Sequence, residues 1–163
     1  MTSSGCLRRG SGARRLALLG FGAAVTAAAA VGGLVVRRVR PEYARLEQPS
    51  WAPPPWLFGP VWTVLYAQIA VAGWLAWRQS GWGPALWSWV AQLALNAVWT
   101  PLFFGAGRRG LAFVDIVLLW LAIGFTEARF RRLSRPAALL MLPYWAWVSF
   151  AAALNLDIWR RNG

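Results

Sequence analysis

The chain contains no histidine and no lysine, a single cysteine (Cys6), and only five acidic residues among 163. Without histidine, neither a histidine-liganded metal centre nor a histidine general base can form. A single cysteine excludes a disulfide bond within the chain. From these residues we predict no metal site, no required cofactor and no catalytic residue of the acid–base type.

What the chain has in abundance is apolar surface. It is 58% hydrophobic and 13% charged, and its mean hydropathy is +0.45. Uncharged runs of roughly 20 residues recur, which is the pattern of transmembrane helices. The chain is therefore predicted to be a multi-pass integral membrane protein. The complete use of arginine in place of lysine suggests a GC-rich coding bias, so we expect a bacterial cell membrane.

All 17 basic residues are arginine, and they give a net charge of +12. A nucleic-acid-binding protein would gather such residues on one surface, whereas here they stand in short clusters between apolar runs. Clusters of this kind hold helix ends among lipid headgroups. The expected partner is therefore the lipid bilayer and not nucleic acid. Nine arginines fall on one predicted side of the membrane and eight on the other, so the positive-inside rule assigns no orientation.

Five apolar segments are long enough to cross a bilayer at 1.5 Å per residue. The predicted fold class is an all-α integral membrane protein with a five-transmembrane-helix bundle. Residues 1–15 form a basic extension that we expect to be disordered, and residues 16–162 form one membrane domain with a long lid loop at 37–55. The predicted helices cover residues 16–36, 56–77, 85–105, 111–130 and 136–159.

The first apolar segment has two interpretations. Arg14 and Arg15 precede an Ala-rich run, and Ala28 and Ala30 have the one-residue separation of a signal-peptidase cleavage site. This arrangement is that of a twin-arginine signal peptide. A retained helix is favoured because the run is longer than a usual signal core and four further spans follow. Small residues at 22, 26 and 30 on this helix also permit close helix packing or dimer contact.

Residues 49–66 combine three tryptophans and a tyrosine with five prolines. Three consecutive prolines, 53–55, predict a stiff, non-helical entry into the second helix, because proline sets φ and removes a backbone donor. The aromatic side chains behind this entry can anchor a helix at the membrane interface, or they can line a pocket for a flat ligand.

Aromatic or amide side chains recur at helical spacing on three helices, which places them on one face of each. Unpaired amides are costly in hydrocarbon, so these faces should point into the bundle or a wet cavity. The alternative is that the tryptophans form an interfacial belt and the amides tie helices together. The residues on these faces are Trp62, Tyr66 and Gly73 on the second helix, Gln92, Asn96, Trp99 and Phe103 on the third, and Tyr144, Trp147 or Val148, Ala151, and Leu154 or Asn155 on the fifth.

Two carboxylates stand near helix ends. Asp115 lies less than two turns from Arg108 and Arg109, and we expect an ion pair at the helix end rather than a functional intramembrane acid. Asp157 precedes two arginines at i+3 and i+4, which also predicts an ordinary ion pair.

Three motifs together resemble the TspO/MBR family, the tryptophan-rich sensory proteins related to the mitochondrial translocator protein or peripheral benzodiazepine receptor. The first is Trp51-Ala-Pro-Pro-Pro-Trp56 with Phe58-Gly-Pro-Val-Trp62. The second is Gln92-Leu-Ala-Leu-Asn96-Ala-Val-Trp99-Thr-Pro101, and the third is Pro143-Tyr144-Trp-Ala-Trp147. The resemblance covers roughly residues 45–162 in order and spacing.

This resemblance implies a five-helix bundle, commonly a homodimer, with a pocket near one membrane face capped by the first long loop. Family ligands include protoporphyrin IX and other tetrapyrroles, so a porphyrin or another flat hydrophobic molecule is the expected ligand. Arginines 37, 38, 40 and 45 are expected to pair with porphyrin propionates. By position, the resemblance implies ligand binding by Trp51, Trp56, Tyr66, Asn96, Trp99, Trp147, Ala151 and Leu154.

The sequence departs from the family pattern at two positions. Leu156 stands where sterol-binding members carry a tyrosine, so sterol binding is not expected. Leu111 stands where animal members carry a pocket tryptophan.

The function expected from the resemblance is tetrapyrrole binding with a sensory or regulatory role in stress or porphyrin homeostasis. One alternative is a light-dependent porphyrin-degrading enzyme, for which Trp51 and Trp147 would be the reactive residues. The other is a small-molecule transporter, although no inverted repeat is evident.

Overall fold

The computed structural model describes the backbone of residues 11–43 and 45–163, and the side chains of residues 12–35 and 45–163. Most of the expected N-terminal extension, 1–15, therefore lies outside the described residues. Its last five residues belong to the first helix, which begins at Ser11.

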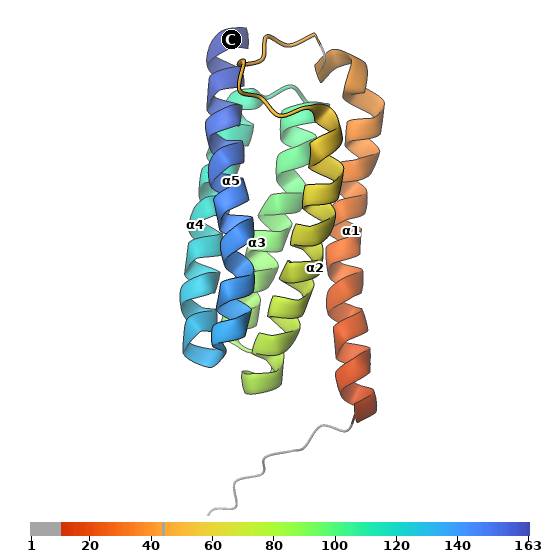
Figure 1. Ribbon diagram of the computed structural model, residues 1–163, viewed down its shortest axis with the longest axis vertical. Helices are drawn as coiled ribbons and strands as arrows, with labels where there is room; N and C mark the ends of the chain where they lie inside the picture. The colour runs from red at the N-terminus through yellow and green to blue at the C-terminus, as the bar shows by residue number, and fades with distance from the viewer. Residues whose placement is uncertain (1–10, 44) are drawn as a thin grey trace, which may run out of the picture.

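Five α-helices and one short π-helix account for the ordered elements, and the described residues include no strand, which confirms the predicted all-α class (Figure 1). Successive helices run in opposite directions, so each connection joins neighbouring ends. The elements are α1 (Ser11–Tyr43), α2 (Pro55–Ser80), α3 (Pro84–Thr100), η1 (Pro101–Gly105), α4 (Arg109–Leu133) and α5 (Arg135–Asn162).

The helices form a ring in the order α1, α2, α5, α4, α3, with α3 returning to contact α1. One end of the bundle carries the 44–54 loop, η1 and the C-terminus, and we call it the loop end. The opposite end carries the start of α1 and the connections at 81–83 and 134, and we call it the turn end. Both ends are visible in Figure 1, with the loop end at the top.

Helix lengths suit a membrane. In the described chain, α1, α2, α4 and α5 are each long and apolar enough to cross a bilayer. The shorter α3 has 17 residues and is continued directly by the five residues of η1. Lipid allows only structures whose backbone polar groups are bonded internally, and a helix bundle meets that requirement. The chain is a five-helix integral membrane protein, as predicted.

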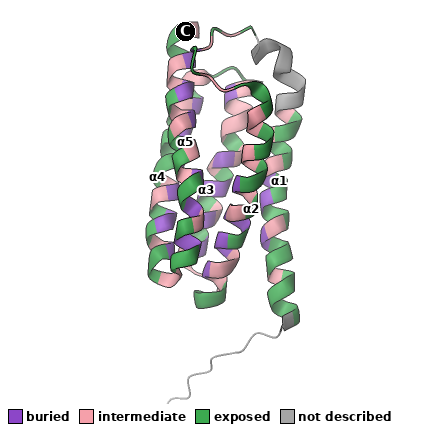
Figure 2. Cartoon of the chain, in the orientation of Figure 1, coloured by how far each residue is buried: buried purple, intermediate pink, exposed green. Residues whose placement is uncertain are grey.

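Close helix packing depends on tryptophans seated on glycines. A Cβ added at Gly73 of α2 would lie 2.8 Å from Trp89 of α3, and one at Gly124 of α4 would lie 2.7 Å from Trp145 of α5. The indole of Trp89 also donates to the carbonyl of Ile69 over 3.0 Å. Four helices thus enclose a dense core, whereas α1 remains mostly exposed at the edge of the bundle (Figure 2).

The ends of α2, α4 and α5 lie within three residues of the sequence prediction, whereas the first and third helices differ more. The first helix continues to Tyr43, so the connection to α2 is 44–54 and not 37–55. The prediction followed the end of the apolar run, but arginine is a good helix former, so the helix continues past that run. The third predicted helix, 85–105, is α-helical only to Thr100.

The change at Pro101 has a local cause. Proline has no backbone N–H and its ring crowds the preceding turn, so an α-helix is disturbed there. The backbone widens instead into a π-helical turn, in which the N–H of Ala106 donates to the carbonyl of Pro101 over 2.8 Å. Gly107 then adopts φ 61°, a left-handed conformation that suits glycine, before α4 begins.

Candidate functional site

A row of aromatic side chains runs along α2 near the loop end. Phe58, Trp62 and Tyr66 are spaced by four residues, so they lie above one another on one helix face. The rings of Trp62 and Tyr66 are 5.2 Å apart. Pro54 is extended, as predicted for the entry into this helix, whereas Pro55 is already the first residue of α2, so the prediction that it precedes the helix is wrong.

This aromatic row forms one wall of a cavity of about 340 Å³ between α1, α2 and the α3–η1 segment. Small residues of α1 form the facing wall, and aromatic residues of α3 and η1 complete it. The lining contains no charged side chain from the described residues. It comprises Ala29, Gly32, Gly33, Pro55, Phe58, Gly59, Trp62, Thr63, Tyr66, Trp99, Thr100 and Phe104.

Glycine allows a close approach of α1 to α3. A Cβ placed on Gly32 would lie 3.3 Å from the hydroxyl oxygen of Thr100, which itself lines the cavity. A larger side chain at this position would therefore enter the cavity or displace Thr100. The cavity therefore has aromatic rings from α2 on one side and from α3 and η1 on another. Its third side is formed by α1, where small residues leave the backbone close to the cavity.

A second layer of aromatic rings from α5 lies behind the α2 row. Trp147 packs against Phe58 with ring centres 5.8 Å apart, and Tyr144 packs against Trp62 at 6.2 Å. Phe150 contacts Trp147 at 5.3 Å, and on its other side it contacts Trp51 of the loop at 5.7 Å. A continuous series of rings therefore leads from the cavity wall to the loop.

Two amides tie the cavity residues to neighbouring helices. The hydroxyl of Tyr66 donates to Oδ1 of Asn96 over 2.8 Å. The indole of Trp99 donates to Oδ1 of Asn155 over 3.1 Å, and Nδ2 of Asn155 donates to the carbonyl of Arg109 over 3.1 Å. These bonds hold two cavity rings, one from α2 and one from α3, in defined positions.

Other polar atoms in the bundle have no protein partner among the described residues. Gln92 is 0% exposed and both of its amide atoms are unpaired, and the indole nitrogen of Trp147 is also buried without a partner. Burying unpaired polar groups is unfavourable, and water or a ligand commonly satisfies them. The interior beside the α2 aromatic row thus has unused hydrogen-bonding capacity.

The structure brings the predicted site residues to different places. Tyr66 and Trp99 line the cavity, and Asn96 lies behind Tyr66 as its hydrogen-bond partner. Trp147 belongs to the second layer, and Trp51 packs on Phe150 at the loop while remaining 47% exposed.

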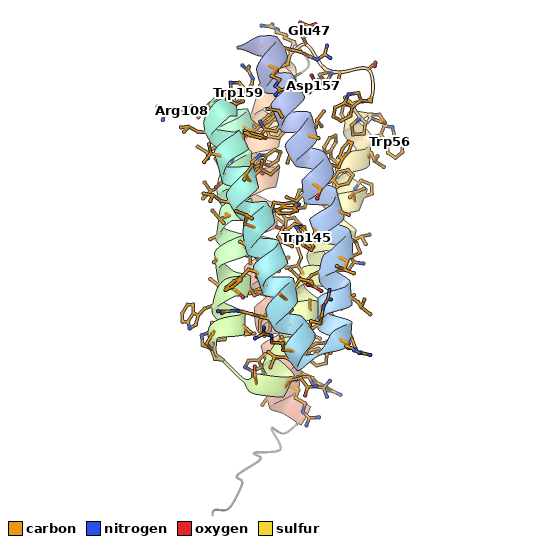
Figure 3. The ribbon with its side chains drawn as sticks, turned by 90° about the vertical axis from the view of Figure 1, so that its left-hand side faces the viewer. Glu47, Trp56, Arg108, Trp145, Asp157 and Trp159 are labelled. Atoms are coloured by element: carbon orange, nitrogen blue, oxygen red, sulfur yellow. The ribbon has the colours of Figure 1, made fainter. Side chains whose placement is uncertain are left out.

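The remaining three predicted residues do not line this cavity. Ala151 and Leu154 are buried in the hydrophobic core. Trp56 is 70% exposed and points away from the bundle (Figure 3).

Sequence reasoning missed several lining residues. Helical spacing placed Trp62 on the inward face with Tyr66, but Trp62 was not included among the expected binding residues, and Phe58, one turn earlier on the same face, could have been added by the same spacing. Ala29, Gly32 and Gly33 gave no signal, because small residues occur throughout the first apolar run and none stands out.

The 44–54 loop is fastened to the C-terminus of α5. The backbone N–H of Glu47 donates to Oδ1 of Asn162 over 2.9 Å, and Nδ2 of Asn162 donates back to the carbonyl of Glu47 over 3.0 Å. Arg161 adds an ion pair with Glu47 at 3.8 Å. We call these contacts the loop latch, and Figure 3 shows Glu47 above the end of α5.

The charged residues near the loop end are placed as follows. Arg45 is exposed, and the side chains of the other three arginines expected to pair with propionates, at 37, 38 and 40, lie outside the described residues.

The predicted pair of Asp157 with Arg161 forms at 2.9 Å. Asp115 forms no ion pair with described residues, so the pair predicted with Arg108 or Arg109 is wrong. Helix α4 buries Asp115 against the core, and its Oδ2 is left without a partner.

Comparisons with known proteins agree on one family. The family model of the TspO/MBR family matches residues 21–160. The sheep (Ovis aries) translocator protein is 42% identical over 125 residues, covering 74% of each chain. Tryptophan-rich protein TspO of Chlorobaculum tepidum is 44% identical over 126 residues, covering 74% of this chain and 78% of that protein.

The Cereibacter sphaeroides tryptophan-rich sensory protein is 37% identical over 146 residues, covering 88% of this chain and 90% of that protein. The bacterial relatives support a bacterial membrane as the location. With its matching family model and its relatives at about 40% identity, this five-helix membrane protein belongs to the TspO/MBR family.

Proposed function

We propose that this protein binds a tetrapyrrole such as protoporphyrin IX in the aromatic cavity and acts as a sensory or regulatory membrane protein. Membership of a family with sensory and translocator names supports a sensory or binding role in a membrane. The observation that carries the tetrapyrrole assignment is the cavity of about 340 Å³ lined by Phe58, Trp62, Tyr66, Trp99 and Phe104. Concave, mostly apolar sites with few polar groups are typical of small-molecule binding.

The chemistry of the ligand fits the lining. A porphyrin presents a broad π-surface, and each offset or edge contact with an aromatic ring contributes about 0.5–1.5 kcal/mol beyond the area buried. The small residues of α1 would allow the macrocycle to approach the backbone. Since the lining has no described charged side chain, the two propionates would have to lie at the loop end, where Arg45 is exposed.

A photochemical role is the second candidate, and one observation favours it. The rings of Trp51, Phe150, Trp147 and Phe58 form an unbroken series from the loop to the cavity. Tryptophans in such a series can donate electrons to a light-excited porphyrin, which requires neither histidine nor metal. In that case Trp147 and Trp51 are the redox-active residues.

Titration of purified protein in detergent with protoporphyrin IX tests the main proposal. We expect saturable quenching of tryptophan fluorescence in the dark, with weaker binding for Trp62→Leu and Trp99→Leu. Trp82→Leu is the matched control, because Trp82 is exposed at the turn end. Quenching that does not saturate, or that all three variants share equally, would contradict a porphyrin site in this cavity.

Illumination separates binding from turnover. If the protein degrades porphyrin, absorbance should continue to fall at substoichiometric protein, and Trp147→Phe and Trp51→Phe should slow the loss. Saturable binding with no such loss supports the sensory role alone.

The proposal also includes a homodimer, as the resemblance implies. The small residues at 22, 26 and 30 of α1 remain partly or fully exposed, so this stripe is accessible to a second copy. Crosslinking in native membranes, with Thr26→Trp to block the stripe, distinguishes a dimer through α1 from a dimer through another helix or a monomer.

A further inference from the structure

A second hollow lies on the outer surface between α3 and α4, at the turn end and away from the aromatic cavity. It has a volume of about 430 Å³. Its floor is made of small side chains, and aromatic rings stand on either side. The residues that define it are Ser88, Ala91 and Ala122 on the floor, Trp87 and Phe125 at the sides, and Pro84 and Arg129 at the end. We call it the α3–α4 groove.

Arg129 is held rigidly at the end of this groove. Its guanidinium lies over the ring of Phe125, 4.1 Å from the ring centre, and its Nη1 donates to the carbonyl of Pro84 over 2.6 Å. These contacts orient the planar group without neutralising its charge. An ordered, aromatic-stacked guanidinium loses little further freedom when it binds an anion.

No carboxylate of the described chain pairs with Arg129. The nearest acid in sequence, Glu127, is buried and already bonded to Arg131 at 2.6 Å. Among the described residues of the turn end, Glu127 is also the only acidic one, and this end carries the exposed arginines 78, 131, 132 and 135. The groove therefore presents an uncompensated positive charge in a cationic surrounding.

Aromatic residues beside the groove place it at the membrane–water interface. Trp87 is 60% exposed and Trp82 is 54% exposed, and their rings meet edge to face at 5.5 Å. Exposed tryptophans of this kind lie at the level of lipid headgroups. The floor residues then extend from that level toward the hydrocarbon, which is the direction of an acyl chain.

We propose that the α3–α4 groove binds an anionic phospholipid. Its phosphate pairs with the guanidinium of Arg129, the indole N–H of Trp87 faces the headgroup, and one acyl chain lies on Ala91 and Ala122. Basic sites between transmembrane helices commonly bind acidic headgroups. A zwitterionic choline lipid is disfavoured, because its quaternary ammonium would be brought into the cationic turn end.

Native mass spectrometry of delipidated protein tests this proposal. Phosphatidylglycerol and phosphatidylcholine with identical acyl chains are titrated separately, and bound lipid is counted. We expect phosphatidylglycerol to bind more tightly, and Arg129→Gln to weaken it about tenfold, as loss of one charge-assisted contact predicts. Arg132→Gln is the matched control, since it removes the same charge from an exposed position nearby, and it should change the affinity less than about twofold.

A second variant keeps the charge and changes only the floor. Ala91 is exposed in the groove, so Ala91→Leu fills the acyl-chain position while leaving Arg129 and its contacts in place. Ala91→Leu should also weaken phosphatidylglycerol binding. It is an independent test of the groove, because it can be measured even if Arg129→Gln fails to fold. Equal binding of the two lipids overturns the proposal, as does an equal loss in Arg132→Gln or unchanged binding in Ala91→Leu.

Discussion

The aromatic cavity at the loop end and the α3–α4 groove at the turn end are built from similar side chains and have different chemistry. In the cavity, Trp62 and Trp99 lie between other rings, and the indole of Trp99 is hydrogen-bonded within the protein. In the groove, Trp87 is exposed, and the same hollow is lined by the guanidinium of Arg129, which has no acidic partner among the described residues. One hollow suits a neutral aromatic surface, and the other suits an anion at an interface.

The comparison shows why the number of tryptophans does not identify a binding site. Both hollows contain tryptophan, and so does the core, where Trp89 is buried against Gly73. Their chemistry differs because of the residues that neighbour each ring: glycine in the core, other aromatic rings in the cavity, and arginine in the groove. The predictions below test whether the two hollows are independent.

The largest effect is expected when the cavity is filled. Gly32→Leu places a branched side chain beside Thr100, within the cavity, and should weaken protoporphyrin IX binding about 100-fold, which corresponds to about 2.8 kcal/mol. Gly20→Leu is the matched control, because a Cβ there meets no atom within 4 Å. Tryptophan quenching measures both. An unchanged affinity in Gly32→Leu would place the ligand elsewhere.

The second-largest effect is expected on stability, when a buried hydrogen-bonding side chain is removed. Asn155→Ala leaves the indole of Trp99 and the carbonyl of Arg109 without their partner in a buried position. We expect the free energy of unfolding to fall by about 2 kcal/mol, since a buried donor or acceptor left unpaired costs about 1–3 kcal/mol. Denaturation in mixed micelles measures it. Ser149→Ala, which removes the exposed bond to Trp120, should cost only about 0.5 kcal/mol.

The loop latch should have a smaller effect, mainly on rates. Asn162→Ala removes both hydrogen bonds to the backbone of Glu47, so the 44–54 loop should separate more easily from α5. We expect porphyrin to bind and dissociate about fivefold faster, in line with about 1 kcal/mol for the lost bonds. Stopped-flow fluorescence measures this. Arg161→Ala should have less effect, since its pair with Glu47 is exposed and 3.8 Å long.

The smallest effect is expected across the two hollows. Arg129→Gln should change the protoporphyrin IX affinity less than about twofold, because the groove and the cavity share no lining residue. The same titration in detergent measures it. A large change would show that the two hollows are coupled through α3, which contributes residues to both.

Sequence reasoning predicted the helices better than the site. The apolar runs and the arginine clusters indicated all five helices, because a bilayer leaves the backbone few alternatives. Their ends were less certain, since α1 continues to Tyr43 beyond its apolar run and Pro101 converts the end of the third helix into η1.

Within the site, periodicity indicated Tyr66, Asn96 and Trp99 on inward faces, and the structure joins two of them by a hydrogen bond. It could not rank Trp51, Trp147 and Trp62, because each has the same chemistry and each contacts another aromatic ring. Only Trp62 lines the cavity. The assignment depends on how α2 and α5 are rotated against each other, which is a property of the packed helices.

The amino-acid sequence by itself determined that this chain crosses a membrane as helices, because its apolar runs match a bilayer and backbone polar groups must be satisfied within each helix. It also determined the family, through motifs in α2, α3 and α5. The tertiary structure alone decided which faces meet. It placed the small residues of α1 opposite the aromatic row of α2, and it left Arg129 without a carboxylate between α3 and α4. Both outcomes depend on side chains from different helices, whose proximity no local pattern encodes.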